Sequence, residues 1–148
     1  MENQQKKYLI IGSIIALYAL HIIFMFVTGV DDFSGFLRRA LGHIGITSLF
    51  LSIVTSAFIK QITQIFETTY IRMHHYFALL GIILLTLHPV VMAIQFGTAS
   101  VFFINIDSWT SFWYGGGRVA FYVIYISTVG ALLRKRFTEY WRYVHGLI

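Results

Sequence analysis

The sequence contains no cysteine, and that absence removes a whole class of chemistry. Without thiolates the chain has no disulfides, no thiolate metal sites and no cysteine-bound iron–sulfur clusters. Charge is scarce as well, because Asp, Glu, Lys and Arg make up 11% of the 148 residues, against roughly 25% in a soluble domain. Hydrophobic residues make up 57%. A chain this poor in charge cannot solvate an ordinary protein surface, so the composition indicates an integral membrane protein.

Several apolar runs approach the roughly 20 residues that a helix needs to cross a bilayer. The expected spans are residues 8–30, 40–59, 73–96 and 119–133, and a fifth helix begins at residues 141–148. The fourth is short by about one or two turns unless the aromatic residues before it extend the helix. The eight residues of the fifth cover about 12 Å as a helix, too little to cross. We therefore expect one all-α domain over residues 1–148, a membrane helical bundle with four full spans and part of a fifth.

The basic residues predict how the bundle is oriented. The first apolar run, Tyr8–Val30, is longer than the roughly 7–15 residues of a signal peptide, so we expect it to remain as a helix. With the N-terminus in the cytoplasm, that side carries Lys6, Lys7, Lys60, Arg72, Arg134, Lys135, Arg136 and Arg142, and the outer side carries Arg38, Arg39 and Arg118. This asymmetry favours a multi-pass cell-membrane protein with a cytoplasmic N-terminus. Since these charges fall at helix ends, they indicate lipid headgroups as partners, and no nucleic acid.

Histidines bracket the most apolar stretch of the chain. His74 and His88 lie 14 residues apart, which places them within about 40° on one helix face and about 21 Å apart. His75 lies about 140° away from His88 around the same helix. Gly81 is seven residues from each end of the His74–His88 stripe and leaves room for a large flat group. Ionisable residues inside a membrane usually serve function, and neutral imidazole is a good ligand for haem iron.

A haem held by two histidines needs them at one depth on two helices. His145 lies near the start of the fifth segment, and His74 lies near the start of the third, both at the cytoplasmic face. Their depths therefore agree. His21 lies well inside the first span without a partner on the same helix, and we expect packing or a secondary site for it. His43 and His75 lie near predicted helix boundaries, where a histidine is often a polar residue that reaches the membrane interface.

Two stretches carry a resemblance to a known family. The third segment, RMHHYFALLGIILLTLHP, resembles the histidine-bearing helix of the ferric-reductase-like transmembrane domain, which ends in L-H-P. The later stretch GGGRVAFYVIYISTVGALLRKRFTEYWRYVHGLI resembles its next helices, in which W-R-x-x-H opens the fifth. The superfamily includes ferric reductases, NADPH oxidases and the haem subunit of bacterial methionine sulfoxide reductase. The resemblance runs from about Leu37 to the end.

The resemblance implies two b-type haems stacked across the membrane between the third and fifth helices. It gives His74 and His145 to the inner haem iron and His88 to the outer one. Arginines at the helix ends would pair with the anionic haem propionates. The residues expected to bind the cofactor are His74, His88, His145, Gly81, Arg72, Arg142 and Arg118.

The sequence also departs from the family pattern. The second histidine of the family's fifth helix would fall at about residue 158 or 159, beyond Ile148, and a sixth helix is missing as well. We therefore expect either the N-terminal part of a longer protein or a short member, with one or two haems. The three glycines at 115–117 lack the strand and helix of a dinucleotide fold, so the chain has no flavin or NAD site.

The favoured function is transmembrane electron transfer, from a cytoplasmic flavoprotein domain or subunit, through haem, to an outer acceptor. Whether the chain is itself an oxidoreductase stays open. One alternative is a histidine-containing proton or metal-ion transporter, which predicts acidic partners inside the helices. Asp31, Asp32, Glu67, Asp107 and Glu139 all lie outside the expected spans. The other alternative is a non-catalytic membrane subunit.

Overall fold

The computed structural model describes residues 2–29, 32–66, 70–133 and 143, which form helices and no strand. Four helices in this part of the chain are long and apolar enough to cross a membrane: α1 (Glu2–Val27), α2 (Phe33–Ala57), α4 (Tyr70–Phe96) and α5 (Trp109–Leu132). A short helix, α3 (Ile59–Phe66), follows α2, and a 3₁₀ turn, η1 (Ala99–Phe102), precedes α5. The predicted all-α membrane fold is confirmed for these residues. Apart from Tyr143, the expected fifth segment lies outside them.

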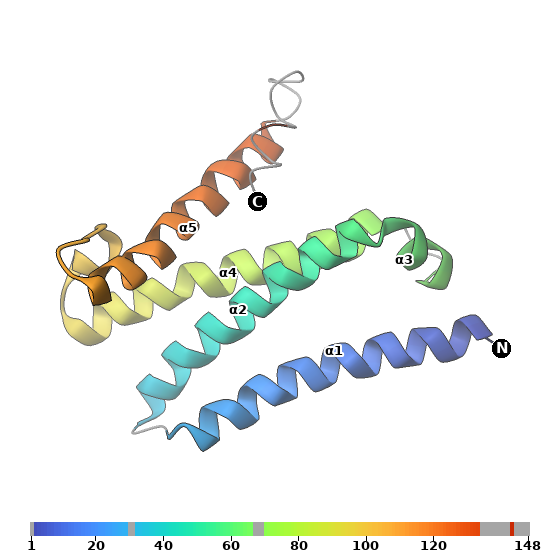
Figure 1. Cartoon of the computed structure of the whole chain (residues 1–148), viewed down its shortest axis with the longest axis horizontal. Coiled ribbons are helices and arrows are strands. Elements are labelled where there is room, and N and C mark those ends of the chain that lie inside the picture. Colours follow the sequence, from blue (N-terminus) through green and yellow to red (C-terminus); the bar gives the residue numbers. More distant parts are fainter. Residues whose placement is uncertain (1, 30–31, 67–69, 134–142, 144–148) are drawn as a thin grey trace. The chain divides into compact units, whose positions relative to one another are not determined.

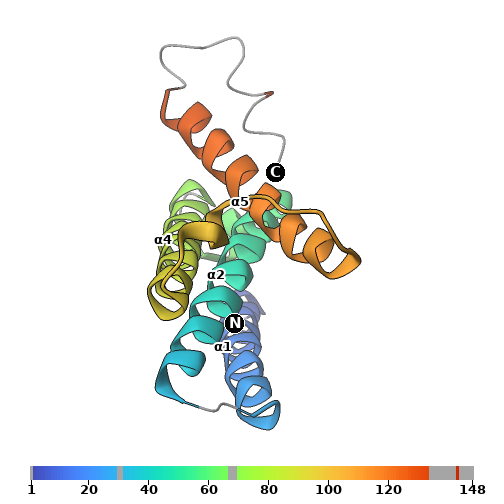
Figure 2. The same cartoon turned by 90° about the vertical axis from the view of Figure 1, so that its left-hand side faces the viewer.

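Contacts divide the chain into two units, Met1–Gly97 and Thr98–Ile148. The first contains α1 to α4, and the second contains η1 and α5. Within the first unit α2 packs along α4, and α1 runs beside α2 (Figures 1 and 2).

Large apolar side chains cover the outside of α1. Leu9 is 72% exposed and Ile15 is 63% exposed, whereas Met25 near the end of the helix is fully buried. A helix that is apolar on its exposed faces suits hydrocarbon as its surroundings, because lipid tails solvate leucine and isoleucine. The exposed apolar surface therefore agrees with a membrane-spanning α1.

All four long helices begin earlier than the apolar runs predict, and polar caps start two of them, α2 and α5. α2 begins at Phe33, and the expected start was residue 40. Just before Phe33, the Asp32 carboxylate accepts a hydrogen bond from the Gly35 backbone N–H at 2.6 Å. α5 begins at Trp109, and the expected start was residue 119. Just before Trp109, the Ser108 hydroxyl accepts a hydrogen bond from the Ser111 backbone N–H at 3.1 Å. The aromatic residues from Trp109 onward thus belong to α5 and give it a full span. The short helix α3 was not expected.

Small residues let α2 and α4 approach closely. A Cβ added at Gly81 of α4 would lie 2.8 Å from the Leu49 side chain and 3.0 Å from the Gly45 carbonyl oxygen. A Cβ at Gly45 of α2 would lie 2.9 Å from Cγ of Leu85. In a membrane, close backbone packing of this kind is a main source of helix association. The α2–α4 pair is therefore the packed centre of the first unit.

Polar side chains join α1 to α2 inside the apolar region. The Tyr18 and Ser48 hydroxyls lie 2.8 Å apart, and Nε2 of His21 lies 3.4 Å from the Thr47 hydroxyl. The ring centroids of His21 and His43 lie 5.5 Å apart, with the ring planes tilted by 51°. These contacts hold the C-terminal half of α1 on α2.

We expect Tyr18→Phe to lower the free energy of unfolding by about 0.6 kcal/mol, the average for interhelical hydrogen bonds in membranes. The reason is loss of the bond to Ser48, whose hydroxyl keeps a second contact with the Ile44 carbonyl. Denaturant titration in detergent micelles measures the change. Tyr8→Phe, at an exposed position, is the control and should change nothing. A loss equal in both variants would contradict a role for this bond.

Candidate functional site

Helix α4 carries His74 near its beginning, where the side chain contacts α2. Nδ1 of His74 lies 2.9 Å from the Ser52 hydroxyl, 2.9 Å from the Ser56 hydroxyl and 3.1 Å from the Ser52 carbonyl oxygen. The ring is half-buried. Because a carbonyl oxygen can only accept, Nδ1 carries the ring hydrogen, and in neutral imidazole Nε2 then carries the lone pair.

His88 lies four helical turns further along α4 and makes the corresponding contact. Its Nδ1 lies 2.8 Å from the carbonyl oxygen of Arg38 on α2, and its ring is also half-buried. The same argument gives Nδ1 the hydrogen and Nε2 the lone pair. Two imidazoles that each turn Nδ1 toward a carbonyl oxygen of α2 thus occupy one helix, about 21 Å apart along its axis.

The other predicted residues of α4 lie differently. His75 is exposed, and its ring centroid is 5.7 Å from that of His74. Arg72 is exposed in the first turn. Gly81 lies midway between the two histidines, and α2, through Leu49 and Gly45, occupies the space beside it. In the structure, then, Gly81 serves the packing of α2.

Arg38 and Arg39 of the first unit bind neutral oxygen atoms. Arg38 donates to the Gln95 amide oxygen at 3.0 Å and lies 5.4 Å from the centroid of the Phe96 ring. Arg39 donates to the Gly29 carbonyl at 2.6 Å. Neither pairs with a carboxylate within the described residues. An anionic group near either arginine would therefore meet no competing carboxylate among the described residues.

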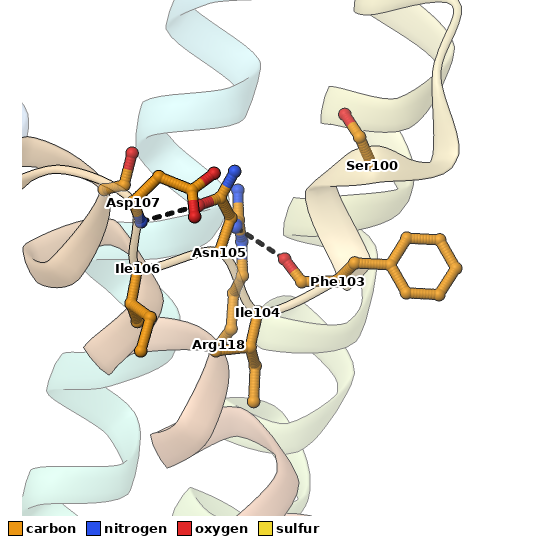
Figure 3. A pocket seen from close by; sticks show the side chains of 8 residues that line it. Ser100, Phe103, Ile104, Asn105, Ile106, Asp107 and Arg118 are labelled. Carbon is orange, nitrogen blue, oxygen red and sulfur yellow. Dashed lines mark hydrogen bonds between the residues drawn. The ribbon is translucent and has the colours of Figure 1, made fainter.

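The second unit holds Arg118 beside a hollow of about 530 Å³. Arg118 donates to the Phe103 carbonyl at 2.6 Å, and Asn105 accepts from the Asp107 backbone N–H at 2.9 Å (Figure 3). The hollow is lined by Ser100, Phe103, Ile104, Asn105, Ile106, Asp107, Ser111 and Arg118. The hydrogen bond from Arg118 to the Phe103 carbonyl joins α5 to the loop before it, so Arg118 holds that loop in place.

Two predicted site residues, His145 and Arg142, lie outside the described residues, so the prediction that they serve the inner haem stays a prediction. Within the described ranges no three His, Asp or Glu side chains gather to hold a metal ion. A centre built by such side chains alone is therefore absent from this part of the chain. Haem requires far less from the protein, because the macrocycle supplies four ligands and histidine supplies an axial one.

The residues present fit a haem in two respects. Nδ1 of each histidine lies against a backbone carbonyl oxygen of α2, the contact by which metal-binding histidines leave Nε2 for the metal. Their separation of about 21 Å, against a hydrocarbon thickness of roughly 30 Å, puts one near each face.

Sequence reasoning missed the contribution of α2. Gly42, Ser52 and Ser56 contact the two histidines or lie beside them. A signal was available, because small residues recur every three or four positions on this helix, at Gly42, Gly45, Ser48, Ser52 and Ser56. Such a stripe is typical of a face that packs closely on another membrane helix.

The fold and the site together define a class: a multi-pass helical membrane protein with half-buried histidines at both ends of one span. The family model described as ferric reductase like transmembrane component matches residues 41–148, more than half of the chain. The protein belongs to this family, which confirms the resemblance seen in the sequence. No curated protein and no solved structure matches the chain.

Proposed function

We propose that this protein carries electrons across the cell membrane through b-type haem bound by His74 and His88. The observation that carries the proposal is the contact that the two imidazoles share: Nδ1 of each ring lies against a backbone carbonyl oxygen of α2. Membership of the ferric reductase like family supports a role in transmembrane electron transfer.

In this proposal, residues of the chain bind the haems and orient them. His74 would hold the inner haem, with His145 as its second ligand, and His88 would hold the outer one. The bound group supplies one-electron redox chemistry. The packed α2–α4 pair shields both imidazoles from water on one side. Basic residues at the helix ends, Arg72 and Arg142 inside and Arg118 outside, would offset the propionate charges.

The direction follows from the charge asymmetry of the loops. A cytoplasmic N-terminus puts the His74 end of α4 on the cytoplasmic side and the His88 end outside. Electrons would then enter from a cytoplasmic flavoprotein domain or subunit and leave to an outer acceptor.

Vesicles test the proposal. The protein is reconstituted with haem into liposomes that contain ferricyanide, and dithionite is added outside. We expect trapped ferricyanide to be reduced faster than in protein-free vesicles, and the gain to disappear in His74→Ala and His88→Ala. Haem-loaded vesicles that reduce ferricyanide no faster than empty ones would contradict electron transfer.

One observation favours a second candidate, a proton or metal-ion transporter. The ring centroids of His21 and His43 lie 5.5 Å apart between α1 and α2, inside the apolar region. A transporter would move protons or Zn²⁺ through haem-free protein, and His43→Ala would stop it. The absence of any flux in haem-free vesicles, or a flux that His43→Ala leaves unchanged, would exclude that function.

A further inference from the structure

Helices α2 and α4 run antiparallel in a register that repeats every seven residues. Three pairs lie opposite each other along the interface: Arg38 with His88, Gly45 with Gly81, and Ser52 with His74. Seven residues are almost two helical turns, so each step returns nearly the same face of each helix to the interface. The two histidines therefore meet equivalent positions of α2, on either side of the glycine contact.

At each end the equivalent group is a backbone carbonyl. Nδ1 of His88 lies 2.8 Å from the Arg38 oxygen, and Nδ1 of His74 lies 3.1 Å from the Ser52 oxygen. Inside a helix such a carbonyl also accepts from the N–H four residues later. The imidazole must therefore reach the oxygen past the side chain at that later position.

That position differs between the two ends. Four residues after Arg38 stands Gly42, where an added Cβ would lie 3.2 Å from both Cε1 and Nδ1 of the His88 ring. Four residues after Ser52 stands Ser56, whose hydroxyl itself lies 2.9 Å from Nδ1 of His74 and donates to the Ser52 carbonyl. The inner histidine thus has hydroxyl partners that the outer one lacks. The outer ring depends on one carbonyl and on the missing side chain of Gly42.

We propose that Gly42 is a positioning residue for His88: by leaving the Arg38 carbonyl open to Nδ1, it presents Nε2 as the metal-binding nitrogen. The tautomer part of this inference stands on the contacts of α2 and α4 alone. That the group bound by Nε2 is haem rests on the proposed function.

The test compares Gly42→Ala and Gly42→Val with Gly45→Ala in the full-length chain. Gly45 is the matched control, since it lies on the same helix and interface, and its added Cβ meets Leu84 and Leu85 rather than a histidine. Haem titration of apoprotein in nanodiscs measures the haem affinity of the His88 site. The signal of this site is identified as the one that disappears in His88→Ala. We expect Gly42→Val to weaken haem binding at that site by about 10–100-fold, the usual effect of losing an outer-shell partner of a metal-binding histidine. Gly42→Ala should weaken it less. Gly45→Ala disturbs the packing of α2 on α4 without touching His88, so any loss of haem that it causes should come without a change of the His88 tautomer.

A second measurement needs no haem. Nitrogen NMR of ¹⁵N-histidine-labelled apoprotein, with His88 assigned by its absence in His88→Ala, distinguishes the protonated ring nitrogen from the unprotonated one. We expect a protonated Nδ1 in the wild type and in Gly45→Ala, and a shift toward protonated Nε2 in Gly42→Val. Packing alone would not change the tautomer.

The outcomes separate the two claims. A wild-type His88 protonated on Nε2 overturns the inference without any variant, even if Gly42→Val fails to fold. Equal loss of haem in Gly42→Val and Gly45→Ala, with the tautomer unchanged, also overturns it. The expected tautomers in a protein that binds no haem support the positioning by Gly42 and contradict the proposed function.

Discussion

Replacing His74 with alanine is expected to abolish the absorbance of the inner haem, whereas His75→Ala is expected to preserve it. Nδ1 of His74 is fixed by three oxygen atoms of Ser52 and Ser56, while His75 is exposed. Removing the residue that binds the iron should lower haem affinity by more than the roughly 10–100-fold that follows removal of a residue hydrogen-bonded to such a ligand.

Difference spectra of the dithionite-reduced and air-oxidised protein measure this effect in both variants. Circular dichroism checks that each keeps its helix content. If His75→Ala bleaches the protein and His74→Ala does not, the assignment of the ligand is wrong by one residue.

A leucine at Gly81 is expected to have the largest effect on stability. The structure leaves no room for it, since even a Cβ would lie 2.8 Å from Leu49 and 3.0 Å from the Gly45 carbonyl oxygen. Inserting methylenes into a packed contact costs about 1–3 kcal/mol, and a backbone neighbour cannot move aside as a flexible side chain can. Because this contact lies between the two histidine–carbonyl pairs, haem binding should weaken at both ends.

Gly12→Leu is the matched control, because a Cβ at Gly12 meets no other part of the described chain within 4 Å. SDS titration in mixed micelles gives the free energy of unfolding, and haem titration gives the affinity. Equal stability of the two variants would mean that α2 and α4 do not pack through Gly81.

Properties of a single helix could be predicted from the sequence. The periodicity of one helix separates His74 from His75 by about 100°, and the structure indeed places His74 against α2 and leaves His75 exposed. Hydropathy likewise predicted four spans, because length and composition decide whether a segment can cross a bilayer. The starts of α2 and α5 were placed too late, since Asp32 and Ser108 extend these helices beyond their apolar parts.

The partner of the histidines could not be predicted in the same way. The contacts of His88 with Arg38, and of His74 with Ser52, depend on the register between two helices. That register is set by the close approach at Gly45 and Gly81, which is a property of the pair. The space beside Gly81 was expected to admit a large flat group, and in the structure Leu49 lies there.

The optical spectrum of the purified protein, expressed with ample haem, shows whether the chain binds haem through His74 and His88. We expect a red protein with a Soret band, whose pyridine haemochromogen is that of b-type haem and whose absorbance falls in His74→Ala and His88→Ala. A folded, helical preparation that stays colourless would contradict it.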